Sequence, residues 1–485
     1  MHVASLLPTF HYGVSFGVPF LFSLSHPSDS HCDGCRRGRW CVLSQPGEIS
    51  QAVINAGVSG WGHTRNVMRV LVVLCCLFSS ALSRELFTGD QVLGITADSD
   101  AQVALLWQKY EQQDLKLHMW RGPPRGSREF SVHVPFSSLQ PVKTFLEARG
   151  IQYEVVIPNV QALLDEEKAD MDRARQRERD TGSFDYASYH TLEEIYAWMD
   201  SLVAENPDLV SKMMIGLSYE KRPIYVLKFS TGVDRPAIWL DTGIHAREWI
   251  SPATGIWTAK KLVTEYGQDP SVTALLNEMD IFFELVVNPD GYAFTHSSNR
   301  MWRKTRSIND GSDCVGVDPN RNWDANFGGP GSSSNPCSET YHGPFPHSES
   351  EVRSITDFII AHANFKAMIT IHSFSQMLMY PYGHSSTPVP NADELHALAK
   401  RAVDALERVH GTKYTYGSMI STIYPASGTT ADWGYASGLR YSFTFELRDT
   451  GRYGFLLPAN QILPTAQETW LALLTLMEHV RDHPY

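Results

Sequence analysis

The amino-acid sequence predicts an α/β protein in two folded parts. These are a small α+β module and a large domain built on a mixed, mostly parallel sheet with helices on both faces. Between residue 84 and about residue 172, strand-like and helix-like segments follow the order β-α-β-β-α-β of the ferredoxin-like fold. From about residue 180 to residue 485, helical patterns alternate with short apolar runs, as in a sheet covered on both faces. A chain of 485 residues could hold about three domains, and one small plus one large domain fits equally well.

The composition is that of a globular protein and gives no sign of a nucleic-acid partner. Hydrophobic residues make up 43% of the chain and charged residues 19%. The net charge is −12, and no basic arm or stripe stands out. We therefore expect no nucleic acid among the partners.

A segment with the features of a secretory signal lies at residues 68–83. Arg69 is its basic start, Val70 to Phe78 its apolar run, and Ala81-Leu82-Ser83 its cleavage site of small residues. The apolar run is too short to span a bilayer. We therefore predict a secreted, extracellular protein.

The position of this signal determines what we expect of the residues before it. Because such signals belong at an N-terminus, Met68 is predicted to be the physiological start and residues 1–67 an upstream, non-native extension. The alternative is a genuine extension with its own export signal near Leu6–Leu24.

The small module contains six predicted elements and no chemical site. The patterns predict strands at 91–95, 115–120, 130–134 and 153–157 and helices at 101–110 and 139–149. No His, Cys or carboxylate groups converge there. By itself the module suits a folding or inhibitory role rather than catalysis.

A charged helix is predicted from Val160 to about Arg179, and its end is rich in arginine. A basic, exposed helix end is an accessible target for a trypsin-like protease, whereas the alternative is a solvated connector between domains. A signal, a small module, an arginine-rich joint and a large domain have the layout of a zymogen. We therefore predict an activation propeptide at 84–177 and a catalytic domain at 178–485.

In the large domain, three chemical groups follow predicted strands. Helical patterns cover 192–205, 250–266, 348–363, 393–410 and 466–480, and apolar runs cover 224–229, 237–240, 281–287, 367–371 and 441–445. Ligands bind beyond the carboxyl ends of the strands in such sheets. His245, His372 and Glu446 each follow one of these runs. An active site is therefore expected at these strand ends.

The stretch Asp241–Trp249 carries an H-x-x-E pair on a strand-to-helix turn. His245 and Glu248 are close enough for an imidazole and a carboxylate to share one ion, and His372 is a candidate third ligand. Three protein ligands with an open fourth position make a catalytic zinc site, and His₂Glu is one such set. The alternatives are a solvated His and Glu at a helix start and a buried structural histidine.

Glu446 is a carboxylate directly after the apolar run 441–445. Burying such a group without a task or a partner costs free energy, which favours a role in acid–base chemistry. The alternative is a salt bridge with Arg448.

The seven cysteines are unevenly distributed. Five precede residue 84, and Cys314 and Cys337 are the pair that remains. In a secreted domain two cysteines predict one disulfide, whereas a cytosolic location would favour two free buried thiols.

Several motifs carry a family resemblance. They are Gly243–Trp249, Asn288–Tyr292, Asn299–Lys304, Asp318–Asn322, Ile371–Ser373, Phe443–Asp449 and the closing His479–Tyr485. In this order they resemble the metallocarboxypeptidases of the pancreatic A/B family, and the closing segment resembles the A-type enzymes. The resemblance runs from the signal to the last residue and fails only over residues 1–67.

The resemblance implies the zinc carboxypeptidase fold, one Zn²⁺ per chain and peptide or protein C-termini as substrates. It also implies a monomer, a propeptide that inhibits its own enzyme, and a trypsin-like activating protease. His245, Glu248 and His372 would bind the zinc ion, with water in the fourth position. Glu446 would be the general base, and Arg303 would stabilise the oxyanion.

The resemblance also implies how a substrate would be held. Asn320, Arg321 and Tyr424 would clamp its terminal carboxylate, because an arginine fork matches a carboxylate and can demand a free C-terminus. The neighbouring groove would be formed by Arg247, Ser373 and Phe374. Phe374 departs from the family, which usually has tyrosine there.

Specificity would depend on the pocket for the terminal side chain. The resemblance places seven residues on its wall: Met379, Met419, Ile423, Ala426, Thr429, Ala431 and Thr444. B-type enzymes carry an acid at the position of Ala431, and A-type enzymes typically carry isoleucine. We therefore expect an uncharged pocket with room for bulky aromatic residues.

Together these observations predict a secreted A-type procarboxypeptidase that releases aromatic or aliphatic C-terminal residues. An inactive, secreted peptide-binding relative is one alternative, but it would be expected to lose the base or a ligand. A zinc-stabilised structural domain is another, but it would need a fourth protein ligand.

Overall fold

The structure is a computed structural model that describes residues 84–112, 117–123, 126–362 and 364–485. These residues belong to one compact unit, Cys76–Tyr485. The predicted signal at 68–83 and the predicted extension at 1–67 lie outside them. Within the described part of the chain, no helix has both the length and the apolar composition needed to cross a bilayer.

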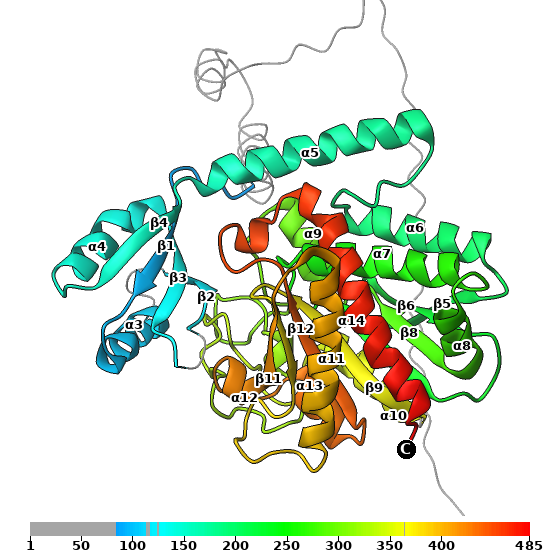
Figure 1. The fold of residues 1–485 in the computed structure, drawn as a ribbon. Coiled ribbons are helices and arrows are strands. Elements are labelled where there is room, and N and C mark those ends of the chain that lie inside the picture. The colour runs from blue at the N-terminus through cyan, green and yellow to red at the C-terminus, as the bar shows by residue number, and fades with distance from the viewer. Residues whose placement is uncertain (1–83, 113–116, 124–125, 363) are drawn as a thin grey trace, which may run out of the picture. The chain divides into compact units, whose positions relative to one another are not determined.

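The small module has the predicted ferredoxin-like order, as Figure 1 shows. Its elements are β1 (Gln91–Thr96), α3 (Asp100–Gln112), β2 (His118–Arg121), β3 (Glu129–Val134), α4 (Phe136–Glu147) and β4 (Gln152–Ile157). The strands form one antiparallel sheet in the order β2-β3-β1-β4. Leu93, Val132 and Leu146 are buried in its core. The prediction for this module is confirmed.

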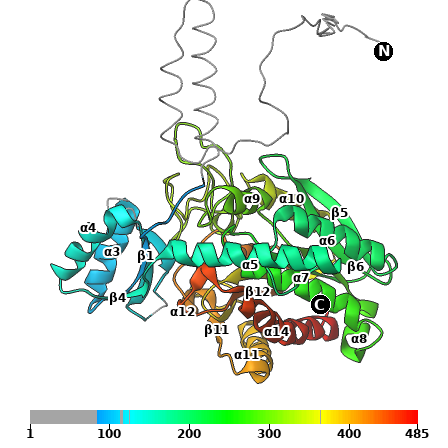
Figure 2. The same cartoon turned by 90° about the horizontal axis from the view of Figure 1, so that it is seen from above.

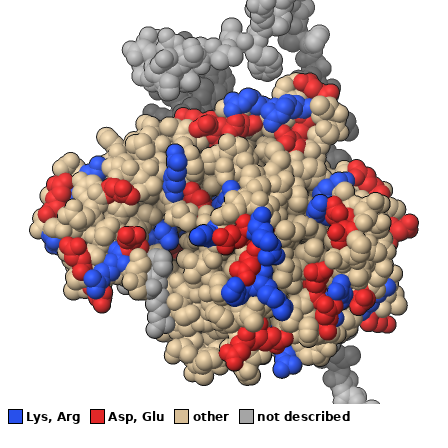
Figure 3. Space-filling view, in the orientation of Figure 1, with Lys and Arg blue, Asp and Glu red and all other residues tan. Residues whose placement is uncertain are grey.

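Helix α5 (Val160–Thr181) connects the module to the large domain and extends two residues beyond the predicted end. It ends at Gly182, whose positive φ of 68° favours glycine. In Figure 1 and Figure 2 it runs from the small sheet along the large domain. Figure 3 shows basic and acidic side chains intermixed along this edge. Two arginines of this helix form ion pairs, Arg175 with Glu194 at 2.8 Å and Arg177 with Asp185 at 2.7 Å.

The large domain is built on an eight-stranded mixed sheet in the order β11-β10-β12-β9-β7-β8-β6-β5. Its strands are β5 (Val210–Leu217), β6 (Pro223–Phe229), β7 (Ala237–Thr242), β8 (Asp280–Glu284), β9 (Phe365–Ser373), β10 (Met377–Tyr380), β11 (Thr415–Ser418) and β12 (Tyr441–Leu447). The central four, β12, β9, β7 and β8, are parallel. The antiparallel partners β10 and β6 flank them. The predicted mixed, mostly parallel sheet is confirmed.

Helices cover both faces of this sheet, as predicted. One apolar cluster joins the strands to α6 (Leu192–Glu205), α7 (Ile250–Glu265), α8 (Pro270–Glu278), α11 (Ala392–His410) and α14 (Ile462–Asp482). A second joins the opposite face to α10 (Ser350–Ala361) and α13 (Thr430–Ala436). The remaining short helices are α9 (Pro289–Ser297) and α12 (Met419–Thr422), with single turns at Pro319–Arg321, Gly454–Leu456 and Ala459–Gln461. Burial on both faces explains why β7 reads as an unbroken buried strand.

Two strands are longer than predicted, and both extend through candidate site residues. His372 lies within β9 and Glu446 within β12, rather than after them. The two residues face each other in the parallel register of these strands. The predicted strands were too short because a polar side chain interrupts the apolar pattern in the sequence, whereas the backbone hydrogen bonding of the strand continues through it. The candidate groups therefore lie on the carboxyl ends of adjacent strands.

A group of buried acids lies elsewhere in the sheet. Asp241 on β7 and Glu284 on β8 are opposite each other in the register, and both oxygens of Glu284 lack a hydrogen-bond partner among the described residues. Burial raises the pKa of Asp241 to about 6, that of Glu351 on α10 to about 7, and that of Glu284 well above its usual value. The stability of this domain must therefore depend on pH.

Candidate active site

The turn after β7 places two of the predicted metal ligands. Gly243 has a positive φ of 68°, and a side chain there would approach the Val286 backbone to 3.3 Å. Glycine therefore permits the sharp turn. The chain then folds so that the Glu248 amide donates to the His245 carbonyl at 3.2 Å. The turn points both side chains to the carboxyl end of the sheet.

His245, Glu248 and His372 come together in the interior, and each is less than 5% exposed. The His245 and His372 Nδ1 atoms lie 3.1 Å apart, His372 Nδ1 lies 3.2 Å from Glu248 Oε2, and His245 Nδ1 lies 2.7 Å from Glu248 Oε1. Ligand atoms around a tetrahedral zinc ion lie about 3.3 Å apart, given bond lengths of about 2.0 Å. The three groups therefore suit one zinc ion and leave a fourth position open. Among the described residues, these three form the one group of His, Cys, Asp or Glu side chains that lie close enough together to hold a metal ion.

Asp318 orients this site, although the sequence alone did not predict this role. The ring of His245 donates from Nε2 to Asp318 Oδ1 at 3.0 Å, so Nδ1, which points to Glu248 and His372, is the nitrogen that would bind a metal. Burial would raise the pKa of Asp318, but Arg303 and His245 hold it well below its usual range. The sequence did offer one indication of this role, because the motif Asp318–Asn322 begins with an acidic residue. A carboxylate–histidine pair behind a metal ligand is a common arrangement.

Glu446 lines the same cavity, and no cation of the described part of the chain lies within salt-bridge distance of it. Its predicted alternative partner, Arg448, instead donates to Glu468 at 2.7 Å and to Gln461 at 2.8 Å, so the structural alternative for Glu446 is wrong. Burial raises the pKa of Glu446, and the neighbouring His372 only partly offsets this. A carboxylate with a raised pKa, next to a metal site, suits proton transfer.

Arg303 lies beside the ligand cluster, as predicted, and is largely buried. Its Nη2 donates to Asp318 Oδ2 at 2.8 Å, and its Nη1 lies 3.8 Å from Glu248 Oε1. The nearby carboxylates raise the pKa of Arg303 although burial alone would lower it. The guanidinium is therefore a fixed positive charge at the cluster.

The three residues of the predicted clamp line one cavity of 420 Å³ together with His245, Glu248 and Glu446. Arg321 uses Nε and Nη1 to donate to the carbonyls of Gly331 and Asn320, both at 2.8 Å. These bonds orient the guanidinium, and its Nη2 has no acceptor among the described residues. Tyr424 comes from the loop after α12. The clamp is thus assembled from distant segments.

Arg247, Ser373 and Phe374 line the same cavity, as predicted. Arg247 Nε and Ser373 Oγ are buried without a hydrogen-bond partner in the described structure. Buried polar atoms without partners are costly, so these two are suited to a polar ligand. Phe374 instead packs against Phe455, with ring centroids 5.0 Å apart.

The apolar end of the cavity differs from the prediction at one residue. Six of the seven expected wall residues line it: Met379, Met419, Ile423, Ala426, Thr429 and Thr444. Ala431 does not; it is 1% exposed and packs in the cluster of Met379 and Met419 behind the wall. Met377, which the prediction omitted, joins the wall. The small Ala431 side chain thus packs behind the methionines rather than lining the cavity itself.

Residues of the small module close this cavity. Tyr110, Met119, Trp120, Arg121 and Gly122 form part of its lining. The Trp120 ring lies 5.1 Å from that of Phe455 and 6.3 Å from that of Phe374, between centroids. The module therefore occupies the space that a substrate would need.

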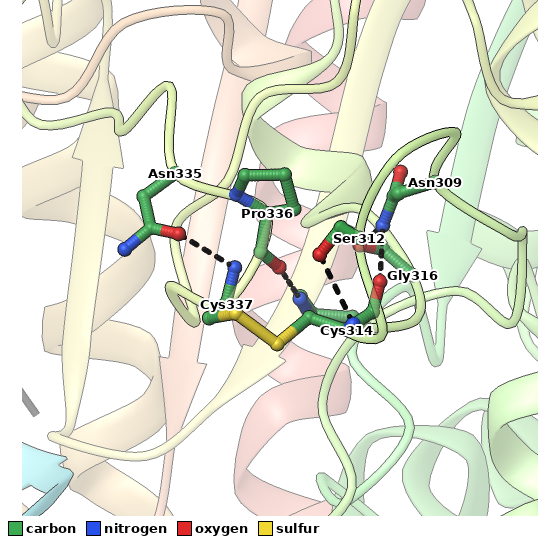
Figure 4. Close-up of a disulfide and its surroundings, with 8 residues drawn as sticks. Asn309, Ser312, Cys314, Gly316, Asn335, Pro336 and Cys337 are labelled. Carbon is green, nitrogen blue, oxygen red and sulfur yellow. Dashed lines mark hydrogen bonds between the residues drawn. A yellow bond between two sulfur atoms is a disulfide. The ribbon is translucent and has the colours of Figure 1, made fainter.

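A disulfide joins Cys314 and Cys337, as predicted, with Cα atoms 5.1 Å apart. Figure 4 shows its surroundings, where the Asn309 side chain donates to the Cys314 carbonyl and the Cys337 amide donates to Asn335. Lys304 donates to the Pro336 carbonyl at 2.7 Å. The bridge and these bonds hold the loop that leads to the cavity wall.

Comparison with known proteins agrees with this geometry. Residues 195–472 match the zinc carboxypeptidase family and residues 93–167 the carboxypeptidase activation peptide. The chain is 61% identical over 416 residues to carboxypeptidase A1 of Sus scrofa, covering 86% of this chain and 99% of that protein. It is 58% identical over 418 residues to carboxypeptidase A5 of Homo sapiens, covering 86% and 96%. The crystal structure of thrombin activatable fibrinolysis inhibitor matches with a TM-score of 0.75 and 38% identity, covering 82% and 100%.

These matches confirm the resemblance read from the motifs and make the small module an activation propeptide. They also agree with a His-Glu-His site that suits zinc. The chain belongs to the zinc carboxypeptidase family and is a metallocarboxypeptidase of the A type, made with an activation peptide.

Proposed function

We propose that this protein is a secreted zymogen of a zinc exopeptidase that releases aromatic or aliphatic C-terminal residues. The observation that carries the proposal is the convergence of one metal-ligand cluster, one buried carboxylate and one arginine clamp on a single cavity. Each of these has a place in peptide hydrolysis, and together they support an exopeptidase.

In this proposal, His245, Glu248 and His372 hold the zinc ion. When bound, zinc supplies Lewis-acid activation of a water molecule and of the scissile carbonyl. Glu446 takes the proton of the attacking water on its carboxylate and passes it to the departing amine. Its position supports that role, because it lines the same cavity as the three ligands and lies opposite His372 in the strand register.

Arg303 and the clamp act on the substrate's charges. The Arg303 guanidinium is fixed by Asp318 and meets the negative charge that develops on the carbonyl oxygen. Arg321 binds the terminal carboxylate, with Asn320 and Tyr424 beside it. The Arg321 bonds to two backbone carbonyls support this role, since they orient the group before substrate arrives.

The terminal side chain enters the apolar end of the cavity. Methionines and small residues form that wall, and the wall residues named above carry no charge. A cationic side chain would lose its water there without a partner. Apolar residues are therefore favoured over Lys and Arg.

Activation requires removal of the propeptide, which we place at 84–177, by a trypsin-like protease near Arg177 or Arg179. Arg179 is exposed, and the end of α5 lies next to the left-handed Gly182. Export would depend on the signal-like segment at 68–83.

The test uses the chain secreted from a cell line, treated with trypsin and offered peptides that differ only in the C-terminal residue. Release of Phe, Tyr or Leu but not Lys or Arg, abolished by a zinc chelator and restored by zinc, is the expected result. Release of Lys or Arg would contradict the assignment of the apolar pocket. No release from any peptide by zinc-loaded protein would favour an inactive peptide-binding relative.

A further inference from the structure

We propose that Glu339, on the upstream wall of the cavity, is a specificity-determining residue that favours substrates with a basic side chain before the scissile bond. The inference rests on the proposed function and names a substrate class for the same site. It is carried by the position of Glu339, by its incomplete pairing and by the group that the propeptide places next to it.

Glu339 lies on a rigid part of the cavity wall. It follows Cys337 by two residues and sits in a turn closed by the Tyr341 amide, which donates to the Ser338 carbonyl at 3.3 Å. The Tyr341 carbonyl in turn accepts from the Asp318 amide at 2.8 Å. The disulfide shown in Figure 4 anchors the start of this turn. The carboxylate of Glu339 is thus presented from a fixed backbone.

The pairing of Glu339 within the protein is weak. Among the described residues, the one cation within ion-pair distance of Glu339 is Arg247, whose Nη1 lies 3.4 Å from Glu339 Oε2. Charge-assisted hydrogen bonds are usually about 2.7 to 2.9 Å long. The Arg247 guanidinium also lies over the Phe455 ring, at 4.2 Å from its centroid. Glu339 therefore retains acceptor capacity, and its side chain is 22% exposed.

The propeptide places polar groups against this wall. His118 and Trp120 both lie on β2 and both approach the ring of His133, with centroids 5.5 and 6.4 Å from it, and Trp120 packs on Phe455. Burial lowers the pKa of His118 to about 4, and the charge that opposes this most is that of Glu339. Tyr110 lines the same cavity. In the zymogen, Glu339 thus acts electrostatically on a neutral imidazole, where a substrate could offer a cation.

The geometry also gives the position of the preferred side chain. The clamp at Arg321 marks the substrate's C-terminus and the His245 cluster marks the scissile carbonyl. Arg247 lies over the Phe455 ring, on which Trp120 of the small module packs. Glu339 lies next to Arg247, so both border the part of the cavity that the small module covers. Glu339 therefore faces residues N-terminal to the scissile bond. Partly exposed charge pairs are modest in energy, so we expect Lys to be preferred over Glu there by about three- to tenfold.

The experiment uses the full chain, secreted, activated with trypsin and loaded with zinc. Its substrates are peptides ending in Phe with Lys, Gln or Glu at the second or the third position from the C-terminus. The measured quantity is the ratio of kcat/KM for the Lys peptide to that for the Glu peptide. Glu339→Gln is compared with Glu278→Gln, which makes the same change of charge at an exposed position at the end of α8.

We expect the wild type and E278Q to prefer Lys at one of the two positions, and E339Q to bring the ratio within about twofold of unity. An unchanged ratio in E339Q, or no preference for Lys in the wild type, would overturn the inference. Should E339Q fold poorly, the salt dependence of the wild type decides: the preference must fall between about 0.05 and 0.5 M NaCl. Failure of the wild type to release Phe even from the Gln peptide would instead reject the proposed function itself.

Discussion

The ion pair between Glu167 and Arg300 joins the propeptide helix α5 to the catalytic domain, and Glu167→Gln should speed the release of the cleaved propeptide. Arg300 Nε donates to Glu167 Oε1 at 2.8 Å and Nη2 to Oε2 at 3.0 Å. The Arg300 side chain is 1% exposed and that of Glu167 9% exposed. Cleavage near Arg177 would leave this pair intact, so the severed propeptide would remain attached through it.

The expected loss of binding free energy depends on the interactions that Arg300 retains in the E167Q variant. Arg300 still donates to the carbonyls of Arg247 and Phe455, both at 2.8 Å, and its guanidinium lies 3.7 Å from the Trp249 ring centroid. Removing one partner of a buried pair costs about 3–5 kcal/mol when the other is left uncompensated. With these bonds retained and one amide oxygen still present, we expect about 2–3 kcal/mol. This corresponds to about 30- to 150-fold in the dissociation rate.

The assay follows the appearance of activity after a short trypsin treatment that cleaves every chain and is then stopped. Activity should rise about 30- to 150-fold faster in E167Q than in the wild type. Glu166→Gln, the exposed neighbour on the same helix, should behave as the wild type. Equal rates for E167Q and the wild type would refute the reasoning that this buried pair retains the propeptide.

Three further predictions concern metal binding, pH and the disulfide. Asp318→Asn should lower zinc affinity about 10- to 100-fold, measured by chelator competition, because His245 loses its carboxylate acceptor; an unchanged affinity would contradict this. Glu351 has a folded-state pKa of about 7 against an ordinary 4.5, so the native state holds a proton that the unfolded state releases between these values. The resulting stability is fully present below pH 4.5 and is lost as pH rises through about 7, by up to about 3 kcal/mol; because Asp241 and Glu284 also have raised pKa values, Glu351→Gln should reduce but not abolish the decline in thermal melts between about pH 5 and 8, and an equal decline in both proteins would exclude a contribution from Glu351. Replacing Cys314 and Cys337 together by serine should cost about 3 kcal/mol in urea unfolding, and a cost near zero would show that the loop is held by its hydrogen bonds alone.

The main elements could be predicted because their patterns are local. Helix α6 has the predicted bounds, and the six elements of the propeptide appear in the predicted order. Periodicity depends on one buried face, which long helices and central strands have. The prediction missed the four-residue strands β10 and β11 and the short helix α13. Elements this short contain too few residues to show a hydrophobic periodicity.

The metal ligands could be predicted for a related reason. His245 and Glu248 are three residues apart, so a single turn brings them close enough to share an ion. His372 lies near the end of β9, the strand that pairs with β7, which precedes this turn. Asp318 carries no such local sign. Its contact with His245 spans 73 residues and depends on how the loops pack.

The sequence by itself predicted the fold class, the cluster of His245, Glu248 and His372, a carboxylate beside it and the zymogen layout, since each rests on neighbouring residues or a recognisable motif. Only the tertiary structure decided that Ala431 lies behind the pocket wall, that Glu167 meets Arg300, and that Glu339 lines the cavity beside Arg247. These contacts join segments up to about 130 residues apart. They depend on the packing of whole elements against one another, for which no short stretch of sequence holds the information.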